Sequence, residues 1–245
     1  MMWRTTTATA GRVLRQLRHD HRTVALLLVV PTMLLVLVRY AFDARPDVFQ
    51  RVGLPLVGVF PLVSMFLVAS IAMLRERRSG TLERLMALPT AKLGLLLGYA
   101  AAFGALAAAQ SITILSFGVV VLDLDVAGPA WLAVVVAIAN ALLGMSMGLF
   151  VSAFAQTEFQ AIQFMPAFIL PQFVLCGLLV ARSAMARPLE LLSTALPMTY
   201  AYDALRAVSD ESDPTGDVFI DLTITVAMGT VALAAGAMTL PRRTP

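Results

Sequence analysis

Few side chains in this chain are of the types that catalyse reactions or bind metal ions. The two histidines, His19 and His21, are two residues apart, so on a helix they point to different faces and do not chelate one ion. The acidic run 210–213 could form a weak cation site, but without further ligands a solvated turn explains it better. The single cysteine, Cys176, excludes an internal disulfide or a thiolate metal cluster. We therefore expect no catalysis by the chain itself, and no bound metal or cofactor.

The energy for any transport must come from elsewhere. A P-loop needs Gly-Lys followed by Ser or Thr, and the only lysine, Lys92, is preceded by Ala91 and followed by Leu93. A gradient-driven transporter needs ionisable groups within the membrane. The only acid in a predicted span is Asp221, in the first turn of the last one, where it complements a helix N-terminus. We expect ATP and magnesium in a separate partner.

Apolar stretches dominate the 245-residue chain, which is 59% hydrophobic and 13% charged, with a mean hydropathy of +0.84. No soluble domain of this size needs so much apolar surface. A helix needs about 20 residues to cross the hydrocarbon core. Six stretches approach or exceed that length: 23–38, 52–74, 93–122, 126–154, 161–181 and 218–240. The sequence predicts an all-α polytopic membrane protein with six transmembrane helices in a single transmembrane domain, residues 1–245.

Three of these stretches define local features. The first is short, but Arg39 can snorkel towards the headgroups, which extends the helix to about Phe42. Its basic leader is long for a signal peptide and no small-x-small cleavage site follows cleanly, so a retained span is preferred. The third and fourth stretches are separated only by residues 123–125. They predict a helical hairpin with a tight, acidic turn.

Charge predicts the orientation of the spans. Beginning with the N-terminal segment, alternate segments hold 12 of the 18 basic residues but only 4 of the 15 acidic ones. Lys and Arg near span ends are retained in the cytoplasm, so both termini are predicted to be cytoplasmic and 182–217 to be an extracytoplasmic loop. Topology and attraction to anionic membrane lipid account for the pI near 9.5, so we expect no nucleic-acid partner.

Two basic segments are candidates for contact with a partner. In the leader 1–22, Val13, Leu14 and Leu17 have helical spacing among arginines, which is typical of an amphipathic interface helix; an ordinary positively charged anchor fits equally well. In the loop 75–92, Gly80 breaks a helix and Thr81 can cap a new one, which ends before a proline. This short helix has an apolar face that could rest on lipid or fill a groove in a cytoplasmic partner.

The sequence resembles the permease subunits of type-2 ATP-binding-cassette exporters, which include bacterial drug, lipid and polysaccharide exporters. The resemblance lies in RERRSGTLERL (75–85) directly after the second span, in RQLRHDHR (15–22) of the leader, and in LPMTYAYDALR (196–206) before the last span. Each motif is short, and their order and placement are more specific than any one of them.

The resemblance implies a function and a set of site residues. The chain would be the permease of an ATP-driven exporter of a hydrophobic or amphipathic substrate in the bacterial cell membrane, working as a dimer with ATP-binding-cassette ATPase subunits. The leader would be an interface helix, and short re-entrant helices would lie within 182–217. A second cytoplasmic contact would include Glu158. The helix that docks on the ATPase would comprise Glu76, Gly80, Thr81, Leu82, Glu83 and Leu85.

Polar and small residues within the spans have two interpretations. Gln110, Asn140, Gln163 and Gln172 could line a pathway, but hydrogen bonds between helices are the safer interpretation. The pairs Gly94/Gly98 and Gly144/Gly148 permit close helix contacts, for which packing within the chain is preferred over the alternative of dimerisation. Two other functions stay open: a non-transporting membrane scaffold, and a gradient-driven transporter, against which the uncharged spans count.

Overall fold

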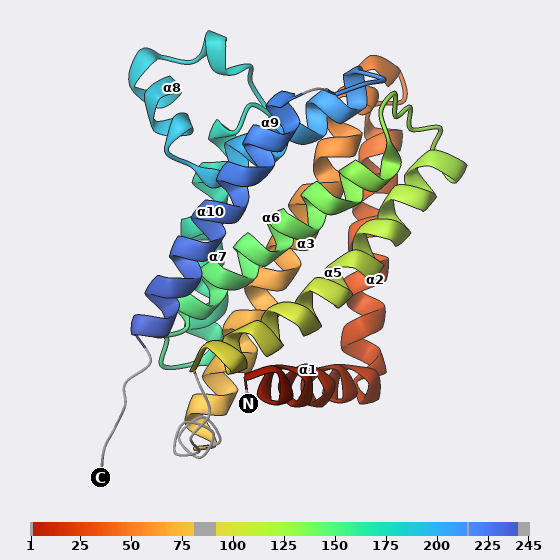
Figure 1. Ribbon diagram of the computed structural model, residues 1–245. Helices are drawn as coiled ribbons and strands as arrows, with labels where there is room; N and C mark the ends of the chain where they lie inside the picture. Colours follow the sequence, from red (N-terminus) through yellow and green to blue (C-terminus); the bar gives the residue numbers. More distant parts are fainter. Residues whose placement is uncertain (1, 81–91, 215, 240–245) are drawn as a thin grey trace.

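A computed structural model describes residues 2–80, 92–214 and 216–239 of the chain. These residues form helices and their connections, without a β-strand among them, so the predicted all-α class is confirmed (Figure 1). The helices are α1 (Met2–His19), α2 (His21–Ala41), α3 (Pro46–Arg78), α5 (Lys92–Val121), α6 (Ala130–Val151), α7 (Glu158–Leu175), the 3-10 helix η1 (Arg182–Ala184), α8 (Arg187–Thr194), α9 (Pro197–Asp210) and α10 (Gly216–Met238).

Five of the described helices are long and apolar enough to cross a membrane. They are His21–Ala41, Pro46–Arg78, Gly94–Val121, Ala130–Val151 and Gly216–Met238. The predicted span 161–181 corresponds to α7, which ends at Leu175 and contains three glutamines and two prolines. These residues lower its hydropathy, and α7 is not among the five. The chain is a multi-pass membrane protein, while the sixth span and the cytoplasmic position of both termini stay predictions.

The second span begins earlier than its apolar stretch suggests. Helix α3 starts at Pro46 rather than at residue 52, with the proline in its first turn and Asp47 complementing the helix N-terminus. Phe49 is buried, and the Arg39 guanidinium lies 5.7 Å from the centroid of its ring. Helix propensity and capping determine where a helix begins, whereas hydropathy marks only its apolar part.

The predicted hairpin between the third and fourth stretches has a longer connection than the three acidic-turn residues. Residues 122–129 connect α5 to α6, so the tight turn over 123–125 is wrong. Asp123 has a positive φ of 53°, and the Gln50 side chain of α3 hydrogen-bonds both its carbonyl and the Asp125 amide. Downstream, Gly128 donates to the Val208 carbonyl of α9. These tertiary hydrogen bonds replace helical ones and delay the start of α6.

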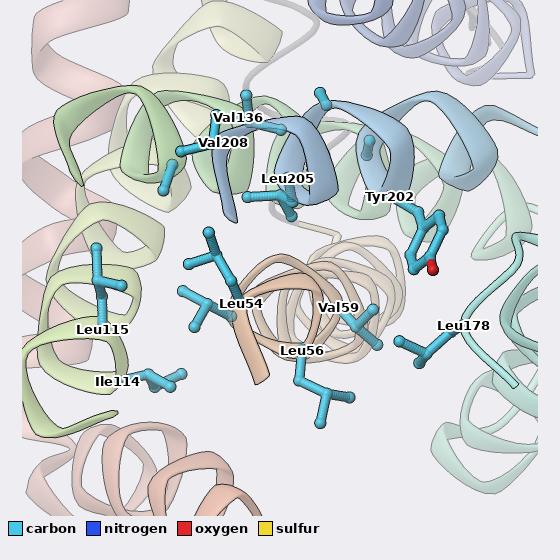
Figure 2. Packing of buried hydrophobic residues seen from close by; sticks show 14 of the residues in the cluster. Leu54, Leu56, Val59, Ile114, Leu115, Val136, Leu178, Tyr202, Leu205 and Val208 are labelled. Carbon is cyan, nitrogen blue, oxygen red and sulfur yellow. The ribbon is translucent and has the colours of Figure 1, made fainter. Parts of the chain in front are cut away.

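Helices α3 and α6 form the centre of the bundle. A Cβ added to Gly144 would lie 2.2 Å from the Leu62 carbonyl oxygen, and one added to Gly148 would lie 2.3 Å from that of Phe66. The two backbones therefore touch, which confirms that this glycine pair serves packing within the chain. Figure 2 shows α3 side chains, including Leu54, surrounded by side chains of α5, α6 and α9.

Short helices precede α10, as the resemblance implied. Helix α9 buries one face, and α8 extends to the side of the bundle (Figure 1). At the opposite end, α1 lies across the ends of the longer helices (Figure 1). Thr9 of α1 is buried against Gly98 of α5, and Val13 is also buried, whereas Leu14 is 40% exposed. The leader is thus a helix, and part of its apolar face packs on the protein itself.

Candidate functional site

The last turns of α3, just before residues 81–91, connect three parts of the molecule. Arg75, Arg77 and Arg78 lie in the last turn of α3, where cations stabilise the helix C-terminus. Glu76 is the only acid in this basic run. The side chains of this run extend to α1, α7 and the α6–α7 connection, and each of these contacts joins residues far apart in sequence.

The first contact holds α1. An Nη of Arg12 lies 2.8 Å from Oε1 of Glu76 and 3.3 Å from the Tyr99 hydroxyl of α5, so one guanidinium joins three helices. The Glu76 side chain is only 13% exposed. Burial alone would lower the pKa of Arg12, but the Glu76 carboxylate and the Tyr99 hydroxyl outweigh burial and raise that pKa above its ordinary value. Arg12 therefore stays charged, and the ion pair persists at physiological pH.

The second contact holds α7. Arg75 donates two parallel hydrogen bonds to Glu158, from Nε to Oε1 at 2.8 Å and from Nη to Oε2 at 3.0 Å. These hydrogen bonds, supported by the positive charge of Arg75, hold the pKa of Glu158 below its ordinary value. Both side chains are more than a third exposed, so water weakens the pair. Glu158, the predicted second contact, thus lies directly beside the end of α3.

The third contact holds the connection between α6 and α7. Arg77 donates from one Nη to the Ser152 carbonyl at 3.3 Å. Its Nε and other Nη are buried without a hydrogen-bond partner within the described part of the chain. Arg77 thus holds the end of α6 beside the end of α3.

Helix α3 ends where the sequence predicts. Ser79 caps the helix, and Gly80 has a φ of +68°, which only glycine adopts without strain. The predicted docking residues Thr81, Leu82, Glu83 and Leu85 lie outside the described residues. The described residues therefore define the base from which the predicted docking helix departs: Glu76 with its ion pair to Arg12, the neighbouring pair Arg75–Glu158, and the turn at Gly80.

Of the four predicted polar residues, three make contacts inside the chain. Gln110 is buried and donates to Ser64 of α3, and Asn140 donates to the Gly58 carbonyl of α3. Gln172 accepts from the Met198 amide of α9. These three side chains therefore make hydrogen bonds between helices, while Oε1 of Gln110 and Oδ1 of Asn140 are buried without a hydrogen-bond partner among the described residues. Gln163 is different, because it is exposed on α7.

Gln163 lines a groove beside the start of α7. The groove has a volume of about 440 Å³, and Gln156 and Gln160 line it together with phenylalanines. For Gln163, both predicted roles therefore stay predictions.

A second charged site lies at the opposite end of the bundle. An Nη of Arg182 is 2.5 Å from a carboxylate oxygen of Asp203, which joins the segment after α7 to α9. Burial raises the pKa of Asp203 above its ordinary value, although Arg182 opposes this effect. Asp203 belongs to the motif 196–206, so the structure gives this motif a structural contact.

Sequence reasoning named Glu76 and Glu158 as contact residues but did not identify Arg12 as the partner of Glu76 and Tyr99, or Arg75 as the partner of Glu158. Nothing in the local pattern pairs residue 12 with residue 76, because the contact depends on the angle at which α1 crosses the bundle. The available signal was charge. Glu76 is an acid that can pair with a basic residue of another cytoplasmic segment, and the leader contains several arginines.

Comparison with known proteins agrees with this architecture. A family model described as ABC-2 type transporter matches residues 4–209. The match covers most of the chain, including the leader and the basic segment after α3, so the chain belongs to the ABC-2 type transporter family. No curated protein matches the chain. The protein is therefore the membrane permease component of an ABC transporter, a class that is generally not itself catalytic, and its family implies partnership with ABC ATPase subunits.

Proposed function

We propose that this protein is the permease of an ATP-driven exporter, coupled to a separate ATPase through the segment that follows α3. The observation that carries the proposal is the convergence of contacts at the end of α3: Arg12–Glu76 to α1 and α5, and Arg75–Glu158 to α7. A displacement of residues 80–85 by an ATPase would move these neighbours with it. Rigid-body movement of packed helices is an established way to change access to a pathway.

The substrate in this proposal is hydrophobic or amphipathic, such as a drug or a lipid-like molecule. A groove of about 420 Å³ between α6, α7 and α10 is lined almost entirely by apolar side chains, among them Met147, Phe168 and Met228. Such a lining suits apolar molecules and offers no site for a small ion. Export from a bacterial cell follows from the resemblance of the sequence to exporters of that type.

The functional unit in this proposal is a dimer, either of two identical chains or of two related ones. Six predicted spans are few for a complete pathway, and Gln163 lines an exposed groove together with Gln156 and Gln160. A second permease chain would supply the other wall of a pathway and hydrogen-bond partners for these amides.

The decisive test is to purify the chain with candidate ATPases encoded in neighbouring genes and to measure transport in vesicles. The proposal expects one ATPase to bind, and transport to stop when ATP hydrolysis by that ATPase is abolished. Binding by none of them, together with transport that persists without hydrolysis, would overturn it. Binding without any transport would favour a membrane scaffold, and transport that collapses with the ion gradient would favour a gradient-driven transporter.

A further inference from the structure

A partly open cavity of about 340 Å³ lies between α1, the start of α2, α3 and α5, and Arg75 and Glu76 lie at its charged end. Its wall on α3 is a single face of that helix, with residues spaced by four positions. The members of this face are Leu67, Val68, Ile71, Ala72, Arg75 and Glu76. The cavity thus runs along more than two helical turns, apolar at one end and charged at the other.

The other two walls repeat this gradient. On α5, which runs antiparallel to α3, Phe103 lies towards the apolar end and Tyr99 towards the charged end. Helix α1 covers the charged end with Val13, Gln16 and Leu17. The lining of the cavity therefore suits an amphiphilic ligand, with its apolar chain at the apolar end and its polar headgroup under α1.

The charges at the mouth are of both signs. Glu76 uses Oε1 to bind Arg12, but its Oε2 is buried without a hydrogen-bond partner within the described ranges. Arg75 and Asp20 line the same mouth, and both are exposed. Arg75 uses Nε and one Nη to bind Glu158, which leaves its other Nη for a ligand. A buried carboxylate oxygen needs a donor, and the remaining Nη of an exposed guanidinium suits a phosphate oxygen. A headgroup that carries an ammonium and a phosphate meets both requirements.

We propose that this cavity binds one zwitterionic phospholipid with an ethanolamine headgroup. Its ammonium donates to Oε2 of Glu76, its phosphate lies beside Arg75, and an acyl chain follows the α3 face from Ala72 to Leu67. The lipid would fill the space between α1 and the bundle, and would act as part of the base that holds α1 in place. This inference concerns binding by the chain alone and does not depend on the proposed transport function.

The test uses the full chain in vesicles of phosphatidylethanolamine and phosphatidylglycerol in equal parts, then extraction into mild detergent and native mass spectrometry. The wild-type chain is expected to retain phosphatidylethanolamine in preference to phosphatidylglycerol. Equal retention of both lipids would overturn the headgroup assignment, and retention of neither would overturn the site. This comparison requires no substitution.

Two pairs of variants locate the lipid. Ile71→Trp fills the cavity and is expected to abolish the retained lipid, while Ile112→Trp, at a position 52% exposed and outside the cavity, is expected to keep it. Glu76→Gln is expected to lose the preference for phosphatidylethanolamine, and Glu211→Gln, an exposed position outside the cavity, to keep it. Thermal melting checks that each variant folds. Equal retention by both tryptophan variants, or an unchanged preference in Glu76→Gln, would overturn the assignment.

Discussion

The two halves of α3 are held by different kinds of contact. Within the bundle, backbone touches backbone where Gly144 and Gly148 of α6 meet Leu62 and Phe66. At the loop end, side chains reach outward, and ion pairs of Arg75 and its neighbour bind α7 and α1. The first kind of contact depends on shape and the second on charge.

This difference indicates which half can move. Interlocked backbones have no alternative arrangement of similar free energy, because any added volume or shift produces a clash. Exposed or partly exposed ion pairs are each worth about 1 kcal/mol or less and can break and form again. The contacts at the loop end of α3 can therefore be exchanged at a lower cost in free energy than those of the bundle half, and the proposed coupling to a partner would use the loop end.

The largest effect is expected from adding one methyl group to the bundle half. Gly144→Ala places a Cβ against the Leu62 carbonyl oxygen, so it should destabilise the folded protein by roughly 2–4 kcal/mol. The matched control is Gly104→Ala, whose Cβ would make only ordinary contact with Leu142. That control should be neutral or slightly stabilising, by up to about 1 kcal/mol. Equal thermal melting of the two variants would contradict the interlocked packing.

The next effect is expected at the partly buried ion pair. Arg12→Ala and Glu76→Ala should each cost about 1–3 kcal/mol, because each leaves a partly buried charge without its partner. The double variant should cost less than the sum of the two, which denaturant unfolding can measure as a coupling energy. The exposed pair Arg39–Asp43 is the control and should show coupling of about 0.5 kcal/mol or less. Additive costs at Arg12 and Glu76 would show that the pair contributes nothing.

A smaller effect is expected beyond the end of α3. Glu83→Lys reverses a charge in the predicted docking helix and should leave membrane insertion intact while weakening ATPase association by about tenfold, or about 1.4 kcal/mol. The control is Glu211→Lys, a charge reversal at the other end of the molecule, which should leave association unchanged. Co-purification with the ATPase measures both. Normal association and transport in Glu83→Lys would remove this residue from the proposed interface.

The smallest effect is expected at the exposed pair that joins α3 to α7. Arg75 lowers the pKa of Glu158 in the folded protein, so the pair stabilises fully above the ordinary carboxyl pKa and is lost as the pH falls through the lowered value. Wild type should exceed Glu158→Gln in melting temperature at pH 7, and the difference should disappear in acid, below about pH 4. The gain at neutral pH should be about 0.5 kcal/mol or less. A difference that is constant with pH would contradict a charge-dependent contact.

Several features could be predicted from local sequence because their causes are local. The end of α3 follows from Gly80, whose positive φ suits no other residue as well. The packing role of Gly144 and Gly148 follows from their spacing on one helix face. The motif after α3 and its place among the spans indicated the family, which the match over residues 4–209 bears out.

Other features escaped local reasoning because their partners are distant. Residues 122–129 became a connection through hydrogen bonds from Gln50 and to Val208, neither of which is nearby in sequence. The burial of Gln110 and Asn140 likewise depended on which face of α5 and α6 met α3. Hydropathy gives the same prediction for a polar residue that bonds a neighbouring helix and for one that faces a pathway.

The sequence by itself determined that this chain crosses a membrane as helices, because lipid requires every backbone group to be bonded within its own segment. It also determined the break at Gly80 and the basic run before it. Only the tertiary structure decided that Glu76 meets Arg12 beneath α1, that Arg75 meets Glu158, and that a cavity lies between them. Those contacts depend on the angles and distances between whole helices, which arise from packing and not from the local pattern of any one of them.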